Sequence, residues 1–168
     1  MKIAKFLIPA ITLLAIGYLG FSSFQKVQRN KEIAATIQSM PAFSFTRQTA
    51  VEFTNSDIDA HAQKLIFSFF NPECEHCQYM AGELVKNSEQ FTKHQVLMVT
   101  TADSVAVDNF IKTYQLNKLS NVVLLRDTHY QFASTFGARI IPSFFIYDEH
   151  RKLVKKFTGE TKIENLLR

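Results

Sequence analysis

The chain has 168 residues, of which 46% are hydrophobic and 20% charged, as expected for about one globular domain with an additional segment. Its two cysteines are too few for a disulfide scaffold. The net charge of +4 comes from basic residues scattered along the chain, without a basic stripe or a nucleic-acid-binding motif, so the sequence argues against nucleic acid as a partner.

The N-terminal segment is predicted to anchor the protein in a membrane. Residues 1–5 are basic, and residues 6–24 carry no charge over about 19 residues, enough to cross a hydrocarbon core of about 30 Å as a helix. The alternative is a cleaved signal peptide, but no A-x-A cleavage site follows the run. We therefore expect an uncleaved signal anchor.

Charge does not orient this anchor, because basic residues flank it on both sides. Its signal-like start nevertheless predicts that the rest of the chain lies outside the cytoplasm, on the periplasmic or extracellular face. Residues 25–40 are polar and basic and are predicted to form a juxtamembrane stalk, and residues 41–168 are predicted to form one domain.

From residue 41 the pattern is one of strands alternating with helices. We expect a hairpin of 42–46 with 51–53, strands at 64–70, 96–99 and 122–125, and helices from 74, after 103 and at 130–136. An antiparallel pair of 144–147 with 153–157 and a short helix within 161–168 are expected to follow. Asp103 is expected to cap a helix start, and Gly137 to end a helix in the left-handed conformation. The order predicts an α/β fold with a mixed sheet flanked by helices.

The two cysteines, Cys74 and Cys77, stand two residues apart directly after the apolar strand at 64–70. A cysteine at a helix N-terminus meets free N–H groups and the helix dipole, which favour a thiolate, so Cys74 is the predicted nucleophile. Cys77 follows one helical turn later, close enough to form a disulfide with it. The pair predicts a redox site that uses this disulfide and no other cofactor.

Two separated motifs, Cys74-Glu-His-Cys77 and Phe136-Gly-Ala-Arg-Ile-Ile-Pro142-Ser-Phe-Phe-Ile-Tyr147, together resemble the thioredoxin superfamily. The helix and strand at 103–125 resemble the central insertion of its membrane-anchored TlpA/ResA-like branch. The resemblance implies a thioredoxin-like fold with an N-terminal hairpin and this insertion. It also implies a cis Ile141–Pro142 bond facing the cysteines, with the Ile141 backbone docking a partner chain.

The same resemblance implies the activity of a thiol-disulfide oxidoreductase. Its partners would be protein thiols or disulfides and an upstream electron donor or acceptor. Two positions depart from the family: Ser68 stands where thioredoxins have a buried aspartate, and Met80 where ResA-like proteins have an acidic residue. Removal of the Cys77 proton is therefore expected to fall to water, Glu75 or His76.

Glu75 and His76 act in opposite directions on the motif. An imidazole beside Cys74 favours its thiolate, as in DsbA-like proteins, which also have histidine before the second cysteine, whereas the Glu75 carboxylate disfavours it. The sequence specifies neither the direction of electron flow nor the partner protein.

Two other functions remain open. A peroxiredoxin-like peroxidase is disfavoured because those proteins have threonine three residues before the reactive cysteine, where this chain has Asn71. A non-enzymatic redox-dependent binding or metal-chelating module would use Cys74, Cys77 and His76, with a second molecule completing the ligand set. The remaining histidines have no spacing typical of ligands: His61, His94, His129 and His150.

Overall fold

The computed structural model describes residues 4–167, and the chain divides into two compact units, residues 1–35 and 36–168. In the first unit, helix α1 runs over Ala4–Thr36 and so includes most of the predicted stalk. Within the described residues, no helix combines the length and the apolar character needed to cross a membrane. The transmembrane segment predicted at 6–24 is therefore not supported by the structure. Residues 1–3 of the predicted basic segment 1–5 lie outside the described residues, and in the predicted transmembrane segment the side chains are described from residue 13 on.

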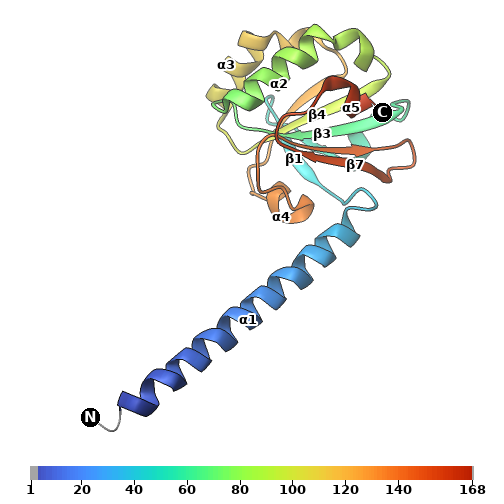
Figure 1. Cartoon of the computed structure of the whole chain (residues 1–168). Coiled ribbons are helices and arrows are strands. Elements are labelled where there is room, and N and C mark those ends of the chain that lie inside the picture. The colour runs from blue at the N-terminus through green and yellow to red at the C-terminus, as the bar shows by residue number, and fades with distance from the viewer. Residues whose placement is uncertain (1–3, 168) are drawn as a thin grey trace. The chain divides into compact units, whose positions relative to one another are not determined.

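The second unit is organised around a mixed sheet (Figure 1). Its described strands form one seven-stranded sheet of order β2-β1-β5-β4-β3-β6-β7, in which β3, β4 and β5 are mutually parallel and the other pairings are antiparallel. The continuous apolar run of β3 suits its interior position, because both faces of this strand are covered. The strands are β1 Ser44–Arg47, β2 Glu52–Thr54, β3 Lys64–Phe69, β4 His94–Thr100, β5 Val122–Arg126, β6 Ser143–Tyr147 and β7 Leu153–Thr158.

Helices α2 and α3 lie on one face of the sheet and α4 on the other (Figure 1). Asp103 caps α3 by accepting a hydrogen bond from the Ala106 amide at 2.8 Å, and Gly137 ends α4 with φ of 65°, both as predicted. The helices are α2 Glu75–Lys86, α3 Ser104–Tyr114, α4 Phe132–Phe136 and α5 Ile163–Leu167, with short 3₁₀ turns η1 Asn55–Asp57, η2 Ser88–Phe91 and η3 Leu116–Lys118.

The two faces of the sheet bury different side chains. Because residues alternate along a strand, Ile66 and Phe70 face the α2 side, where they join one apolar cluster, while Phe67 faces the α4 side. The α4 side is aromatic: the rings of Phe132 and Phe136 stack with centroids 4.2 Å apart. The two cysteines belong to the α2 side, and the aromatic side chains pack on the opposite face of the sheet.

The start of the folded unit differs from the sequence prediction. Ile37, expected in the stalk, is buried with 4% exposure, so the folded unit begins before residue 41. The hairpin of β1 and β2 forms as predicted, and β1 then joins the rest of the sheet through β5, with Thr46 opposite Arg126.

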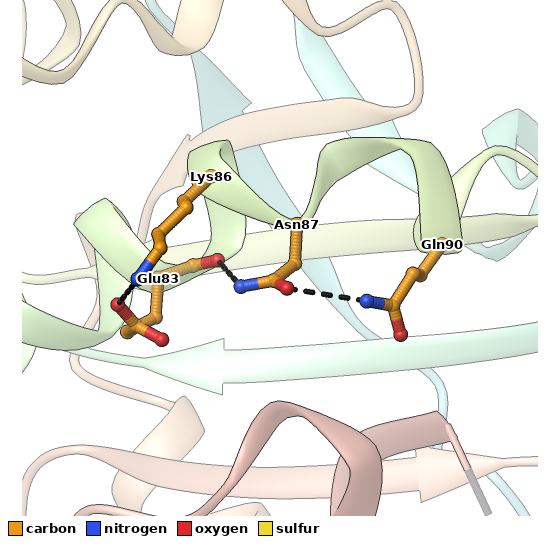
Figure 2. A network of polar contacts seen from close by, with 4 residues as sticks. All are labelled: Glu83, Lys86, Asn87 and Gln90. Atoms are coloured by element: carbon orange, nitrogen blue, oxygen red, sulfur yellow. Dashed lines mark hydrogen bonds and ion pairs between the residues drawn. The ribbon is translucent and has the colours of Figure 1, made fainter.

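Side-chain contacts define the C-terminal end of α2 (Figure 2). The Asn87 side chain donates to the Glu83 carbonyl at 2.8 Å and accepts from Gln90 at 3.1 Å, while Lys86 pairs with the Glu83 carboxylate at 3.4 Å. The Glu83 carbonyl also accepts the Asn87 backbone amide at 3.1 Å, so both the backbone and the side chain of Asn87 bind this carbonyl. The helix that begins at the cysteines is thereby closed at its far end.

Candidate redox site

The motif lies at the turn between β3 and α2, with Cys74 as the N-cap residue of the helix. The turn is held by its own polar groups: the Asn71 side chain accepts from the Glu73 amide at 2.9 Å, and the Asn71 carbonyl accepts from the Cys74 amide at 3.1 Å. The Gln78 side chain donates to the Pro72 carbonyl at 2.8 Å. These bonds fix the loop that presents the first cysteine at the helix N-terminus.

The two thiols are free and differ in environment. Cys74 is half-buried, whereas Cys77 is only 2% exposed. Burial raises the pKa of the Cys77 thiol to about 12; a backbone hydrogen bond from Asn71 opposes this increase, and the hydrogen bond and charge of Cys74 add to it. Cys74 is therefore the accessible sulfur, and Cys77 is a protonated thiol behind it.

The sheet register explains why the motif meets the Pro142 loop. β3 and β6 are antiparallel neighbours, with Phe69 at the end of β3 opposite Ser143 at the start of β6. The residues just after β3 and just before β6 consequently lie at the same edge of the sheet. The Ile141–Pro142 bond there is cis, as the sequence resemblance implied.

Further contacts connect this loop to the cysteines. Pro142 and Cys77 line the same small cavity, and Ile141 and Cys74 both pack against the apolar cluster of the α2 face. The Ser143 hydroxyl donates to the Ile140 carbonyl at 2.5 Å, which fixes the turn before the proline. The structure therefore brings together residues that are more than 60 positions apart in the sequence.

The cavity behind Cys77 has a volume of about 20 Å³ and is mainly apolar. Ser68, 5% exposed, and Met80, 4% exposed, both line it, at the two positions where relatives were expected to have acidic residues. Among the described lining residues there is no carboxylate, so the buried Cys77 thiol has no acidic neighbour in this cavity. The remaining candidates for proton exchange with Cys77 are Glu75 and His76. Both side chains are exposed at the start of α2.

Glu160 is the site residue that sequence reasoning missed. Its Oε1 atom lies 2.5 Å from Nδ1 of His76, although the two residues are 84 positions apart. Glu160 follows Gly159, which comes directly after β7, and a glycine at a strand end signals only a turn. No local pattern ties this carboxylate to the motif.

The histidines other than His76 do not gather around the cysteines. His61, His129 and His150 are exposed, and His94 lies at the start of β4. Throughout residues 4–167, no group of three or more histidine, cysteine, aspartate or glutamate side chains is arranged to hold a metal ion. A chelating site of the kind weighed from the sequence would need ligands from a second molecule.

Comparison with known proteins agrees with this geometry. Residues 37–156 match the AhpC/TSA family. The chain is similar to the thiol-disulfide oxidoreductase ResA of Bacillus subtilis (strain 168), with 27% identity over 167 residues, covering 96% of this chain and 88% of ResA. A similar ResA of Bacillus anthracis has 25% identity over 171 residues, covering 99% of this chain and 95% of that protein.

Solved structures share the fold. A secreted Mycobacterium tuberculosis disulfide oxidoreductase homologous to E. coli DsbE has a TM-score of 0.61 at 18% identity, covering 79% of this chain and 94% of that chain. A thiol-disulfide oxidoreductase from Bacteroides fragilis NCTC 9343 has a TM-score of 0.63 at 18% identity, covering 76% and 96%. These similarities confirm the predicted thioredoxin-like fold, and the relatives bear out the predicted resemblance to ResA-like oxidoreductases.

Proposed function

Because the chain belongs to the AhpC/TSA family of thioredoxin-like proteins, we propose that it is a thiol-disulfide oxidoreductase whose Cys74–Cys77 pair exchanges disulfides with other proteins. The observation that carries the proposal is the inequivalence of two neighbouring thiols. Cys74 is accessible at the N-terminus of α2, while Cys77 is buried with a pKa of about 12. The relatives named thiol-disulfide oxidoreductase support it.

The first step uses Cys74. Reacting as its thiolate, the Cys74 sulfur attacks one sulfur of a partner disulfide. The partner S–S bond breaks, a mixed disulfide forms between Cys74 and the partner, and the second partner sulfur leaves as a thiolate that takes up a proton. Cys77 does not compete for the partner, because it is buried and protonated.

The second step uses Cys77. Its thiol loses a proton and attacks the Cys74 sulfur, the mixed disulfide breaks, and the remaining partner sulfur leaves as a thiolate. Two electrons have then passed from the cysteine pair to the partner, and a Cys74–Cys77 disulfide remains. The same steps in reverse oxidise a partner dithiol, and an upstream donor or acceptor resets the pair.

We assign docking of the partner to the turn that contains Ile141 and Pro142. The register of β3 with β6 supports this assignment, because it puts the turn at the sheet edge where the motif begins, and Ile140 in the turn is 58% exposed. An extended partner segment could pair with the Ile141 backbone as an added strand, leaving its sulfur at Cys74.

We further propose that residues 6–24 tether the protein to a membrane, with the redox domain outside the cytoplasm. The uncharged run in the sequence supports the tether, and the secreted structural relative supports the location. The test is alkaline carbonate extraction of membranes from cells that express the full chain, followed by protease treatment of intact spheroplasts. Release of the protein into the wash would overturn the tether, and protection from protease would overturn the location.

The exchange reaction is tested with the full chain and two variants. Reduced wild-type protein should reduce insulin disulfides, and dithiothreitol should then return its Cys74–Cys77 disulfide to the dithiol. The Cys77→Ser variant should stop at a mixed disulfide between Cys74 and insulin, which mass spectrometry detects. Cys74→Ser should form no such adduct. A Cys74→Ser protein that reduces insulin as well as wild type would overturn the assignment, and rapid consumption of hydrogen peroxide without a protein disulfide would favour the peroxidase.

A further inference from the structure

A groove of about 540 Å³ lies beside the cysteine motif, between the loop that precedes α2 and the first turns of α3. Its place follows from the sheet: β3 and β4 are parallel neighbours, so the residues after both strands lie at the same sheet edge. Pro72 and Glu73 follow β3, Asp103 follows β4, and all three line the groove. The other neighbour of β3 is β6, which begins at the Pro142 turn. The groove and the proline turn therefore lie on either side of the strand that leads to Cys74.

The lining of the groove is partly aromatic. It includes Phe110 and Tyr114 of α3, whose ring centroids are 4.8 Å apart, and Val105, an exposed apolar side chain of the same helix. The cavity behind Cys77, at about 20 Å³, is too small for any partner side chain. The groove falls within the range of about 300 to 1,000 Å³ that is usual for ligand sites. It can therefore receive side chains of a protein segment whose sulfur is at the motif.

The groove is negatively charged. Glu73 and Asp103 are both exposed, and its described lining residues include no lysine, arginine or histidine. Asp103 also caps α3, but accepting the Ala106 amide leaves its negative charge in place. Helices α2 and α3 both begin at this sheet edge, and each N-terminus contributes about half a positive charge. Two carboxylates exceed this sum by about one negative charge, so the groove favours a cation.

We propose that this groove binds the segment of a partner protein that flanks its reactive cysteine, and that it selects segments carrying lysine or arginine. The proposal rests on the proposed function, since exchange at Cys74 brings a partner backbone beside the groove. A basic side chain has an apolar stem and a charged head, so the stem can pack on the aromatic rings while the head pairs with Glu73 or Asp103. An acidic segment would be repelled by the same two carboxylates.

The test measures how fast the full chain carrying Cys77→Ser reacts with peptides that each contain one cysteine. The peptide cysteine is joined by a disulfide to thionitrobenzoate, a coloured thiol. When the Cys74 thiolate attacks the peptide sulfur, a Cys74–peptide disulfide forms and thionitrobenzoate leaves as a thiolate. The peptides carry lysine, glutamate or leucine in turn at each position near the cysteine. Each rate is divided by the rate with 2-mercaptoethanol, an uncharged thiol, which corrects for the intrinsic reactivity of the peptide.

At the position that reaches the groove, the lysine peptide should react about fivefold faster than the glutamate peptide, as expected for two exposed ion pairs. Adding Glu73→Gln or Asp103→Asn to the Cys77→Ser chain should lower this ratio to about twofold, and adding both should lower it to about one. Asparagine caps a helix as well as aspartate does, so α3 is preserved. Asn109→Lys, which adds a positive charge to the lining, should also lower the ratio. Asp108→Asn removes a charge of α3 outside the groove and should leave it at about fivefold.

The ratio for each variant cancels any change in the reactivity of Cys74 itself, because both peptides meet the same sulfur. Equal rates for lysine and glutamate at every position would overturn the proposal, and so would the fastest reaction with leucine, which would indicate an apolar occupant. A fivefold ratio that survives the double replacement, or an equal loss in Asp108→Asn, would also overturn it. A Cys77→Ser chain that forms no disulfide with any peptide would instead refute the proposed function, so the two failures are distinguishable.

Discussion

The buried thiol of Cys77 should resist alkylation far more strongly than an ordinary cysteine. The test uses Cys74→Ser, in which Cys77 is the remaining thiol and burial, the main cause of its raised pKa, is preserved. At about pH 8, a thiol with a pKa of about 12 is about 0.01% thiolate, whereas an unfolded cysteine with a pKa of about 8.5 is about 24% thiolate. The ratio of thiolate populations is therefore about 2,000.

The assay follows iodoacetamide labelling of Cys77 by mass spectrometry, in the folded variant and in the same variant unfolded in urea. Because the thiolate is the reacting species, folded Cys77 should react at least about 200 times more slowly, even with a pKa one unit lower than expected. Its 2% exposure slows the reagent further, in the same direction.

The pH profile separates the raised pKa from simple steric protection. With a pKa of about 12, the folded labelling rate should rise about tenfold per pH unit through about pH 10, while the unfolded rate levels off above about 9. A folded rate that levels off with the unfolded one would mean that access alone protects Cys77. A folded rate within about tenfold of the unfolded rate at about pH 8 would refute the reasoning altogether.

The burial of Cys77 and of Phe132 leads to two further expectations. The Cys77 thiol has a higher pKa in the folded than in the unfolded chain, so the reduced protein should lose stability as the pH rises from about 9 towards 12. Urea unfolding at several pH values measures this loss. The disulfide form has no thiol proton at Cys77 and should lose less stability over the same pH range. Phe132→Ala, on the aromatic face, should lower the unfolding free energy by about 3 to 5 kcal/mol. The thiol-disulfide equilibrium with glutathione should not change, because Phe132 lies across the sheet from the cysteines. A shifted equilibrium would show that the two faces are coupled.

Local patterns determined most of the fold. The alternation of strands and helices, the Asp103 cap and the Gly137 helix end depend on a few neighbouring residues, so each could be predicted from the chain alone. The Cys74 position at a helix start was equally local, because a strand, a turn and Cys-x-x-Cys follow one another in sequence. The start of the domain was placed too late: Ile37 is buried, and the residues just after it pair with a segment far along the chain, Ser39 with Lys152.

Only the tertiary structure decided how the site is completed. The pairing of β3 with β6 sets Pro142 beside the motif, and the continuation of β7 brings Glu160 to His76; both depend on strand register between distant segments. The unequal burial of the two cysteines likewise comes from a cavity assembled from several elements. The sequence by itself thus determined which atoms can react. Desolvation and long-range strand pairing set which of the two sulfurs is accessible and which charged groups lie near the motif, and no local pattern encodes either of them.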